Sequence, residues 1–196
     1  MHGLINKSVQ SFLRAHYGEA VWREVAEVIG VAPEGFEAML HYDDRLTEEL
    51  LSAAQAVLDE PREALLEDIG AWIAMTEPLR RLLRFGGVDY WDFLFSLDDL
   101  QGRGLMALPD LELPELSLRT EPGGRLTLLV SGSFPGWGAV LAGLMRAMAD
   151  DYGALVLIEP LGAEAGVERV QVHLLEASFS EGRRFDLAMP SLGGVA

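Results

Sequence analysis

Apolar residues recur every three or four positions along the first 107 residues, which is the spacing of one helical face. Val9, Phe12 and Leu13 follow this spacing, Tyr17-Gly18 interrupts it, and Gly30 is suited to end the next segment. Thr76 and Asp89 are suited to cap later helices, and Pro61 fits a first helical turn. Further helices are therefore predicted over 46–59, 61–75, 77–85 and from Asp89 through Gln101.

The pattern changes after residue 108. Segments 116–120 and 125–131 read as two strands joined by a Pro-Gly-Gly turn, and 136–153 reads as one helix. Two further strands are predicted over 154–161 and 167–177. The order β-β-α-β-β after a helical half indicates an α+β fold. We expect one domain over 1–185, with a mainly helical lobe (1–107), a sheet lobe (108–185) and a tail (186–196).

Composition limits the possible partners. The chain has 196 residues, 49% of them hydrophobic, and a formal net charge of −16. This charge disfavours nucleic acid and anionic membranes as partners. The absence of cysteine excludes disulfides and thiolate metal sites. The first ten residues lack a signal-peptide core, and no apolar run reaches membrane-spanning length. We therefore expect a soluble, cytoplasmic protein.

No sequence motif assembles a catalytic or metal site. No two of the four histidines are three or four residues apart, and no nucleophile or phosphate-binding motif occurs. The acid pairs at 43–44, 98–99 and 150–151 lie near predicted helix ends or loops, where capping or solvation is expected. We expect no enzyme activity. One set of side chains suits either an ordinary core or an apolar cavity: Phe93, Phe95, Met106, Phe134, Trp137 and Met145.

Several stretches together resemble the heme nitric-oxide/oxygen binding (H-NOX) family. They are MHGLINKSVQSFLRAHYGEAVW at the start, DYWDFLFSLDDL, LPDLELPELSLR, GGRLTLLV and YGALVLIEPLG, so the similarity spans nearly the whole chain. The resemblance implies a helical subdomain packed on a mixed β-sheet subdomain, with heme between them. It also implies a free-standing sensor that signals to a separate kinase or nucleotide cyclase.

The functional residues of the family can be placed on this chain one by one. The proximal histidine that binds the heme iron follows the LDDL stretch, where this chain has Gln101. Pro114 matches the proline that presses on the porphyrin. The Tyr-x-Ser-x-Arg motif that holds the heme propionates falls on Val130, Gly132 and Phe134. Ser131 and Ser133 lie beside these positions, and strand alternation would point them to the other face. Ile5 is a further candidate for lining the pocket.

These four replacements remove the family's means of holding heme. A carboxamide is a poor iron ligand compared with imidazole. Hydrogen bonds to charged groups are worth roughly 1.5–3 kcal/mol each, and Val130, Gly132 and Phe134 have no side-chain donor. The favoured hypothesis is an H-NOX-type regulatory domain that has lost family-type heme ligation and uses an altered apolar pocket or a protein partner.

Two other hypotheses remain open at this stage. One is a heme sensor with a substituted axial ligand, drawn from His2, His16 or His41. It needs new propionate anchors, for which Arg103, Arg119 and Arg125 are the candidates in the sequence. The other is an enzyme that modifies tetrapyrroles, for which the sequence suggests no substrate.

Overall fold

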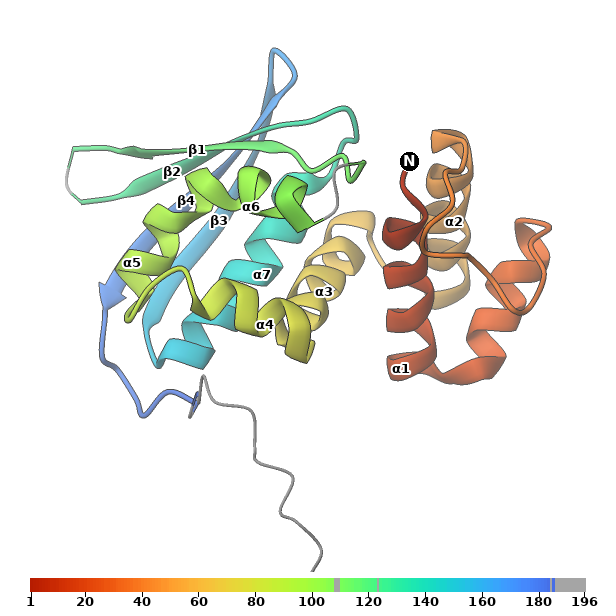
Figure 1. Cartoon of the computed structure of the whole chain (residues 1–196), viewed down its shortest axis with the longest axis horizontal. Helices are drawn as coiled ribbons and strands as arrows, with labels where there is room; N and C mark the ends of the chain where they lie inside the picture. Colours follow the sequence, from red (N-terminus) through yellow and green to blue (C-terminus); the bar gives the residue numbers. More distant parts are fainter. Residues whose placement is uncertain (108–109, 123, 184, 186–196) are drawn as a thin grey trace, which may run out of the picture.

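The computed structural model describes residues 1–107, 110–122, 124–183 and 185. Helices occupy the first half and a sheet with one long helix occupies the second half (Figure 1). The predicted tail, 186–196, lies outside the described residues. The elements are α1 (Gly3–Val28), α2 (Asp44–Leu58), α3 (Arg62–Met75), α4 (Glu77–Arg84), α5 (Tyr90–Phe95), η1 (Ser96–Asp99), α6 (Leu100–Ala107), β1 (Glu115–Thr120), β2 (Leu126–Ser131), α7 (Trp137–Tyr152), β3 (Leu155–Glu164) and β4 (Val167–Glu176).

The predicted breaks in the helical half are confirmed. α1 is interrupted at Gly18, whose φ of 86° and ψ of 171° are not helical. Gly30 follows the end of α1 with a φ of 67°, in the left-handed region that glycine adopts without strain. Thr76 stands at the N-cap of α4, but its hydroxyl donates to the Ile73 carbonyl and forms no cap.

The segment that carries Gln101 was expected to be one helix, and it is three. Asp89 caps only α5, where its side chain accepts from the backbone N–H of Asp92 at 2.9 Å. The chain then tightens into the 3₁₀ turn η1, and Gln101 belongs to α6. The Asp98 carboxylate accepts from the Leu118 N–H of β1 at 2.6 Å. This contact ties η1 to the sheet, which a prediction from helical spacing does not anticipate.

The predicted strand order along the chain is confirmed, and the fold class is α+β. The four strands form one sheet in the order β1-β2-β4-β3. All three neighbouring pairs are antiparallel, so the expectation of a mixed sheet is wrong in that detail. The reason is that β4 lies between β2 and β3. The crossover through α7 makes β2 and β3 run in the same direction without being neighbours.

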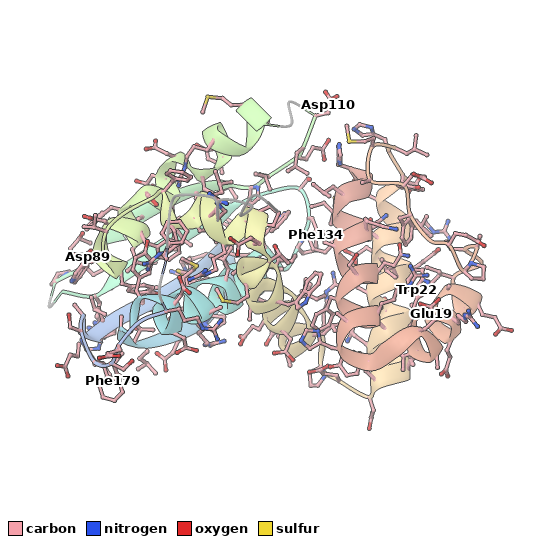
Figure 2. The ribbon with its side chains drawn as sticks, turned by 60° about the horizontal axis from the view of Figure 1, so that its bottom comes forward. Glu19, Trp22, Asp89, Asp110, Phe134 and Phe179 are labelled. Carbon is pink, nitrogen blue, oxygen red and sulfur yellow. The ribbon has the colours of Figure 1, made fainter. Side chains whose placement is uncertain are left out.

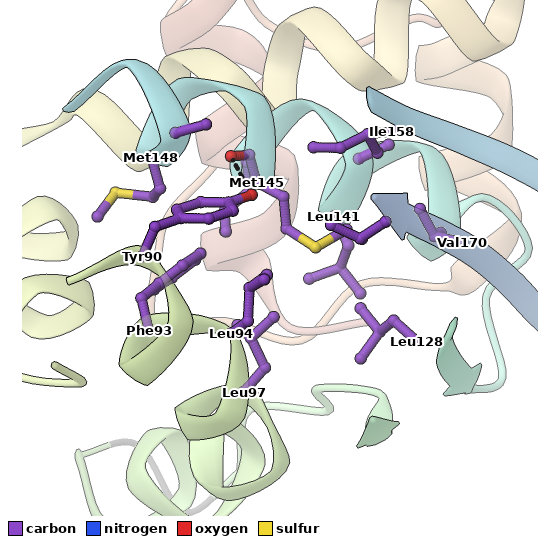
Figure 3. Packing of buried hydrophobic residues seen from close by; sticks show 14 of the residues in the cluster. Tyr90, Phe93, Leu94, Leu97, Leu128, Leu141, Met145, Met148, Ile158 and Val170 are labelled. Carbon is purple, nitrogen blue, oxygen red and sulfur yellow. Dashed lines mark hydrogen bonds between the residues drawn. The ribbon is translucent and has the colours of Figure 1, made fainter. Parts of the chain in front are cut away.

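Two clusters of buried side chains form the core. One joins α1, α2 and the first part of α3 to Phe134 and Ala139. The other joins α4, α5 and η1 to α7 and the sheet, with Phe93, Leu94 and Met145 among its members (Figure 3). The boundary between the two clusters therefore falls within α3, whereas residue 107 marks only a change of secondary structure along the chain.

Helices α3 and α7 cross in direct contact between the two clusters. A Cβ added at Gly70 would overlap the Val140 carbonyl oxygen, and one added at Gly143 would overlap that of Glu67. Glycine at both positions lets the two backbones touch. This contact fixes the relative position of α3 and α7, which both contribute side chains to the cavity described below.

Tyr90 predicts how stability changes at alkaline pH. Its side chain is fully buried, and its hydroxyl donates to the Met145 carbonyl at 3.0 Å (Figure 3). Burial raises the pKa of Tyr90, and the nearby Asp150 carboxylate adds to this shift. Tyrosine in the unfolded chain ionises near about pH 10. The unfolded state therefore loses its proton first, and stability falls as the pH rises above that value.

The Tyr90→Phe variant is expected to lose about 1 kcal/mol of stability at pH 8, the net value of one hydrogen bond. It should also lose less stability than the parent between pH 8 and pH 11. Urea unfolding at the two pH values measures both effects. An equal loss of stability between pH 8 and pH 11 in the two proteins would show that ionisation of Tyr90 does not cause the alkaline destabilisation.

Candidate functional site: an apolar cavity between the two halves

A cavity of about 360 Å³ lies between the α1–α2 part of the molecule and the sheet part. This volume is within the range of small-molecule sites. Phe134, which follows β2, lies between the two parts (Figure 2). The lining residues are Leu4, Ile5, Ser8, Val9, Thr47, Leu51, Leu66, Ile69, Ile73, Thr76, Pro78, Leu79, Leu100, Gln101, Leu111, Leu113, Pro114, Leu116, Phe134, Trp137, Val140, Leu141 and Leu144.

Four of the six site residues predicted from the sequence line this cavity: Ile5, Gln101, Pro114 and Phe134. Gly132 lies beside it, since a Cβ there would meet Pro114 at 3.3 Å and the indole of Trp137 at 3.0 Å. Val130 does not line the cavity. It is buried in the core cluster of the sheet, because the core side of β2 carries Leu126, Leu128 and Val130.

The six aromatic and methionine side chains that the sequence suggests for a core or an apolar cavity lie in three different environments. Phe134 and Trp137 line the cavity. Phe93 and Met145 are fully buried in the core. The last two, Phe95 and Met106, are exposed at 53% and 80%.

Gln101 stands where the cavity meets the surface. It also lines an open depression with His41, Leu105, Asp110, Leu111, Glu112, Leu113 and Ser133. Its side-chain amide donates from Nε2 to the Leu113 carbonyl at 3.0 Å, which fixes the orientation of the carboxamide. Ser133 faces this depression and not the cavity.

Phe134, which the resemblance places at the position of the family's arginine, packs between Trp137 and Arg62. Its ring packs edge-on against Trp137, with the centroids 6.2 Å apart. The Arg62 guanidinium lies 5.5 Å from the centre of the Phe134 ring, but it pairs with Glu48 at 2.8 Å. The cation nearest this ring therefore already has a carboxylate partner.

The N-terminus of α7, which directly follows these positions, already binds a carboxylate. Glu168 of β4 accepts from the backbone N–H groups of Gly136 and Gly138, at 2.9 and 3.0 Å. Such N–H groups, with the helix dipole, favour an anion. Here the protein supplies that anion itself.

None of the histidines considered as replacement ligands lines the cavity. His2 is buried and caps α1, where its Nδ1 accepts from Leu4 N–H at 3.2 Å. His16 packs against Phe12, with ring centroids 4.7 Å apart, outside the cavity. His41 is exposed, stacks edge-on with His2 at 5.1 Å and lines only the outer depression.

The suggested arginine anchors are also elsewhere. Arg103 donates from Nη2 to the carbonyl and hydroxyl oxygens of Ser96, and from Nη1 to the Leu82 carbonyl. Arg119 and Arg125 are exposed on the β1–β2 hairpin, and none of the three lines the cavity.

The residues present do not fit heme held in the family manner. Among the described residues that line the cavity there is no histidine, cysteine, methionine or tyrosine to bind iron, and no lysine or arginine to bind propionates. Across the described part of the chain, no cluster of three or more metal-binding side chains occurs. The cavity instead has the chemistry of a site for an uncharged, mainly apolar molecule.

Comparison with known proteins identifies the family. The sequence profile of the haem-NO-binding family matches residues 2–159. This chain belongs to the haem-NO-binding family. It is 27% identical over 168 residues to the soluble guanylate cyclase gcy-31 of Caenorhabditis elegans, and 23% identical over 158 residues to the soluble guanylate cyclase 89Da of Drosophila melanogaster. These matches cover 84% and 79% of this chain, but only 24% of each cyclase.

Solved H-NOX structures share the fold. An H-NOX protein from S. oneidensis in the Fe(II)NO ligation state has a TM-score of 0.75 at 16% identity, covering 90% of this chain and all of that one. An oxygen-binding H-NOX domain related to soluble guanylate cyclases has a TM-score of 0.71 at 15% identity, covering 94% of this chain and all of that one. The haem-NO-binding fold recognised from sequence motifs is therefore confirmed.

Two features of the site were not anticipated from the sequence. Glu168 is one acidic residue among many in a strand, and nothing local marks it as the partner of a helix 30 residues earlier. The Thr47 hydroxyl donates to the buried Asn6 side chain at 2.7 Å, between helices 41 residues apart. A signal of covariation across homologues would be needed to find such pairs.

Proposed function

We propose that this chain is a sensory or regulatory domain of the haem-NO-binding family whose cavity binds an uncharged apolar molecule instead of heme held in the family manner. The observation that carries the proposal is the lining of the cavity, which offers neither an iron ligand nor a cation among the described residues. Gln101 and Phe134 stand where the family has its histidine and arginine, and Glu168 takes up the anion-binding end of α7.

The cavity is placed to pass a signal to the surface. Its walls come from α1, α2 and α3 on one side and from α4, α6 and α7 on the other. A molecule bound there would change the packing between the two sides. Because the matched relatives are guanylate cyclases four times as long as the matched region, we propose a separate kinase or nucleotide cyclase as the partner in the cytoplasm. No helix in the described part of the chain is long and apolar enough to cross a membrane.

The proposal predicts that the purified chain binds the uncharged dye N-phenyl-1-naphthylamine with one saturable site. A bulky side chain inside the cavity should abolish this binding, so Ile5→Trp is expected to lower the affinity by at least about tenfold. Dye fluorescence on titration measures the binding. Heme added at equal concentration should give no stoichiometric Soret band.

Val28→Trp is the matched control, because Val28 lies on the same helix and is 65% exposed. It should bind the dye as the parent does. Absence of a saturable dye site in the parent, or a stoichiometric Soret band from added heme, would refute the proposal.

A second candidate function rests on the position of His41. This histidine lines the same depression as Gln101, where the resemblance places the family's iron ligand. If the chain were a heme sensor with a substituted ligand, His41→Ala would remove a Soret band that the parent shows. The same spectra therefore separate the two functions.

A further inference from the structure

The hydroxyl side chains among the described residues that line the cavity are biased toward accepting hydrogen bonds, while Trp137 contributes an indole N–H donor. Three hydroxyls line it, and each already donates its proton to a protein oxygen. Ser8 donates to the Leu4 carbonyl at 2.8 Å, Thr47 to the Asn6 side chain at 2.7 Å and Thr76 to the Ile73 carbonyl at 2.7 Å. A hydroxyl has one donor and two acceptor positions, so these groups can offer a ligand only their lone pairs.

Gln101 adds an acceptor at the mouth of the cavity. One of the two N–H groups of its Nε2 donates to the Leu113 carbonyl at 3.0 Å, and its Oε1 stays available as an acceptor. No donor among the described residues reaches this oxygen. Among the described residues, Gln101 is also the one polar residue shared by the cavity and the outer depression. A ligand with its tail in the cavity would therefore bring its polar end to Gln101.

Acidic residues line the depression at the mouth of the cavity. The depression contains Asp110 and Glu112, and its described lining has no lysine or arginine. Arg62, near Phe134, is paired with Glu48. A ligand whose polar end is negative would meet repulsion at the mouth and no lysine or arginine among the described residues inside, and burying an unpaired charge is costly.

Resting on the function proposed above, we propose that the ligand is a neutral apolar molecule whose polar end donates a hydrogen bond, and that Gln101 Oε1 accepts it. An aliphatic alcohol has this chemistry. A carboxylate does not, and an ether of the same length lacks the donor. Gln101 thus has a binding role of its own at the position of the family's iron ligand.

Displacement of N-phenyl-1-naphthylamine by three matched molecules at pH 8 tests this inference. They are 1-decanol, decyl methyl ether and decanoate. The alcohol is expected to bind about fivefold more tightly than the ether, the value of one net hydrogen bond. Decanoate should bind at least about tenfold more weakly than the alcohol, since its charge is not compensated.

Gln101→Met removes the acceptor, together with the amide N–H groups and their bond to the Leu113 carbonyl, and keeps a similar shape. In this variant the preference for the alcohol should disappear, while the affinity for the ether stays within about twofold. Equal binding of alcohol and ether by the parent would overturn the inference, as would a preference that survives in Gln101→Met or tighter binding of decanoate. If the dye binds and Ile5→Trp abolishes its binding, these results leave the proposed function standing. If the dye has no saturable site, both fail.

Discussion

Replacing Asp151 with asparagine is expected to lower the free energy of unfolding by about 3–5 kcal/mol, as removal of one partner of a buried ion pair does. Asp151 lies near the end of α7 and is fully buried. Its carboxylate is 2.8 Å from Arg80 Nε and 3.6 Å from Arg84 Nε, and these two side chains are only 14% and 15% exposed. Asparagine would leave both positive charges buried without this carboxylate. Urea unfolding followed by circular dichroism measures the loss.

The neighbouring residue provides the control for this experiment. Asp150 is exposed, so Asp150→Asn is expected to change stability by no more than about 0.5 kcal/mol. The two variants change net charge equally and differ only in burial. Similar losses in both would mean that the effect comes from overall charge and not from the pair with Arg80.

The same pair links stability to the site. Both arginines belong to α4, whose first turn contributes Pro78 and Leu79 to the cavity wall. Asp151→Asn should therefore also weaken dye binding, since α4, which forms part of the cavity wall, would lose its ion pairs with α7.

Asp151 shows where prediction from the sequence stops. The three acid pairs were predicted to cap helices or lie in solvent. Asp43 does cap α2, accepting from Arg45 N–H at 2.9 Å. Asp98 instead binds β1, 20 residues later, and Asp151 pairs with a side chain 71 residues earlier. Capping depends on neighbours in the chain and can be read locally. Partners far apart in sequence depend on the finished packing.

Several residues that line the cavity could be named from the sequence for a related reason. Family resemblance placed Gln101, Pro114 and Phe134 by position, and these residues line one cavity although they come from different elements. Val130 was placed in the same way but is buried in the core. Alternation along β2 decides which side chains face the core, and a valine loses nothing by facing inward. The acceptor bias of the hydroxyls could not be read from the sequence, because it depends on which protein oxygen each one reaches.

Introducing at two of these positions the residues that the resemblance assigns to the family is expected to strengthen heme binding. Histidine at 101 supplies an iron ligand, and arginine at 134 supplies a charge-assisted hydrogen bond worth roughly 1.5–3 kcal/mol to a propionate. Together, Gln101→His and Phe134→Arg should tighten heme binding by at least about tenfold relative to the parent. The measurement is the Soret band during titration of the purified protein with heme.

The controls distinguish heme binding at the cavity from a general effect of adding a histidine or an arginine. Met106→His adds a histidine to the same helix at a position 80% exposed, and it should not create a Soret band of equal strength. The single variant Phe134→Arg should gain less than the double variant, because it still lacks an iron ligand. The same double variant should lose affinity for N-phenyl-1-naphthylamine, since a charged arginine replaces part of the apolar wall. Heme binding by the parent that equals that of the double variant would show that Gln101 and Phe134 are no obstacle to heme. The proposal that the cavity does not hold heme in the family manner would then be wrong.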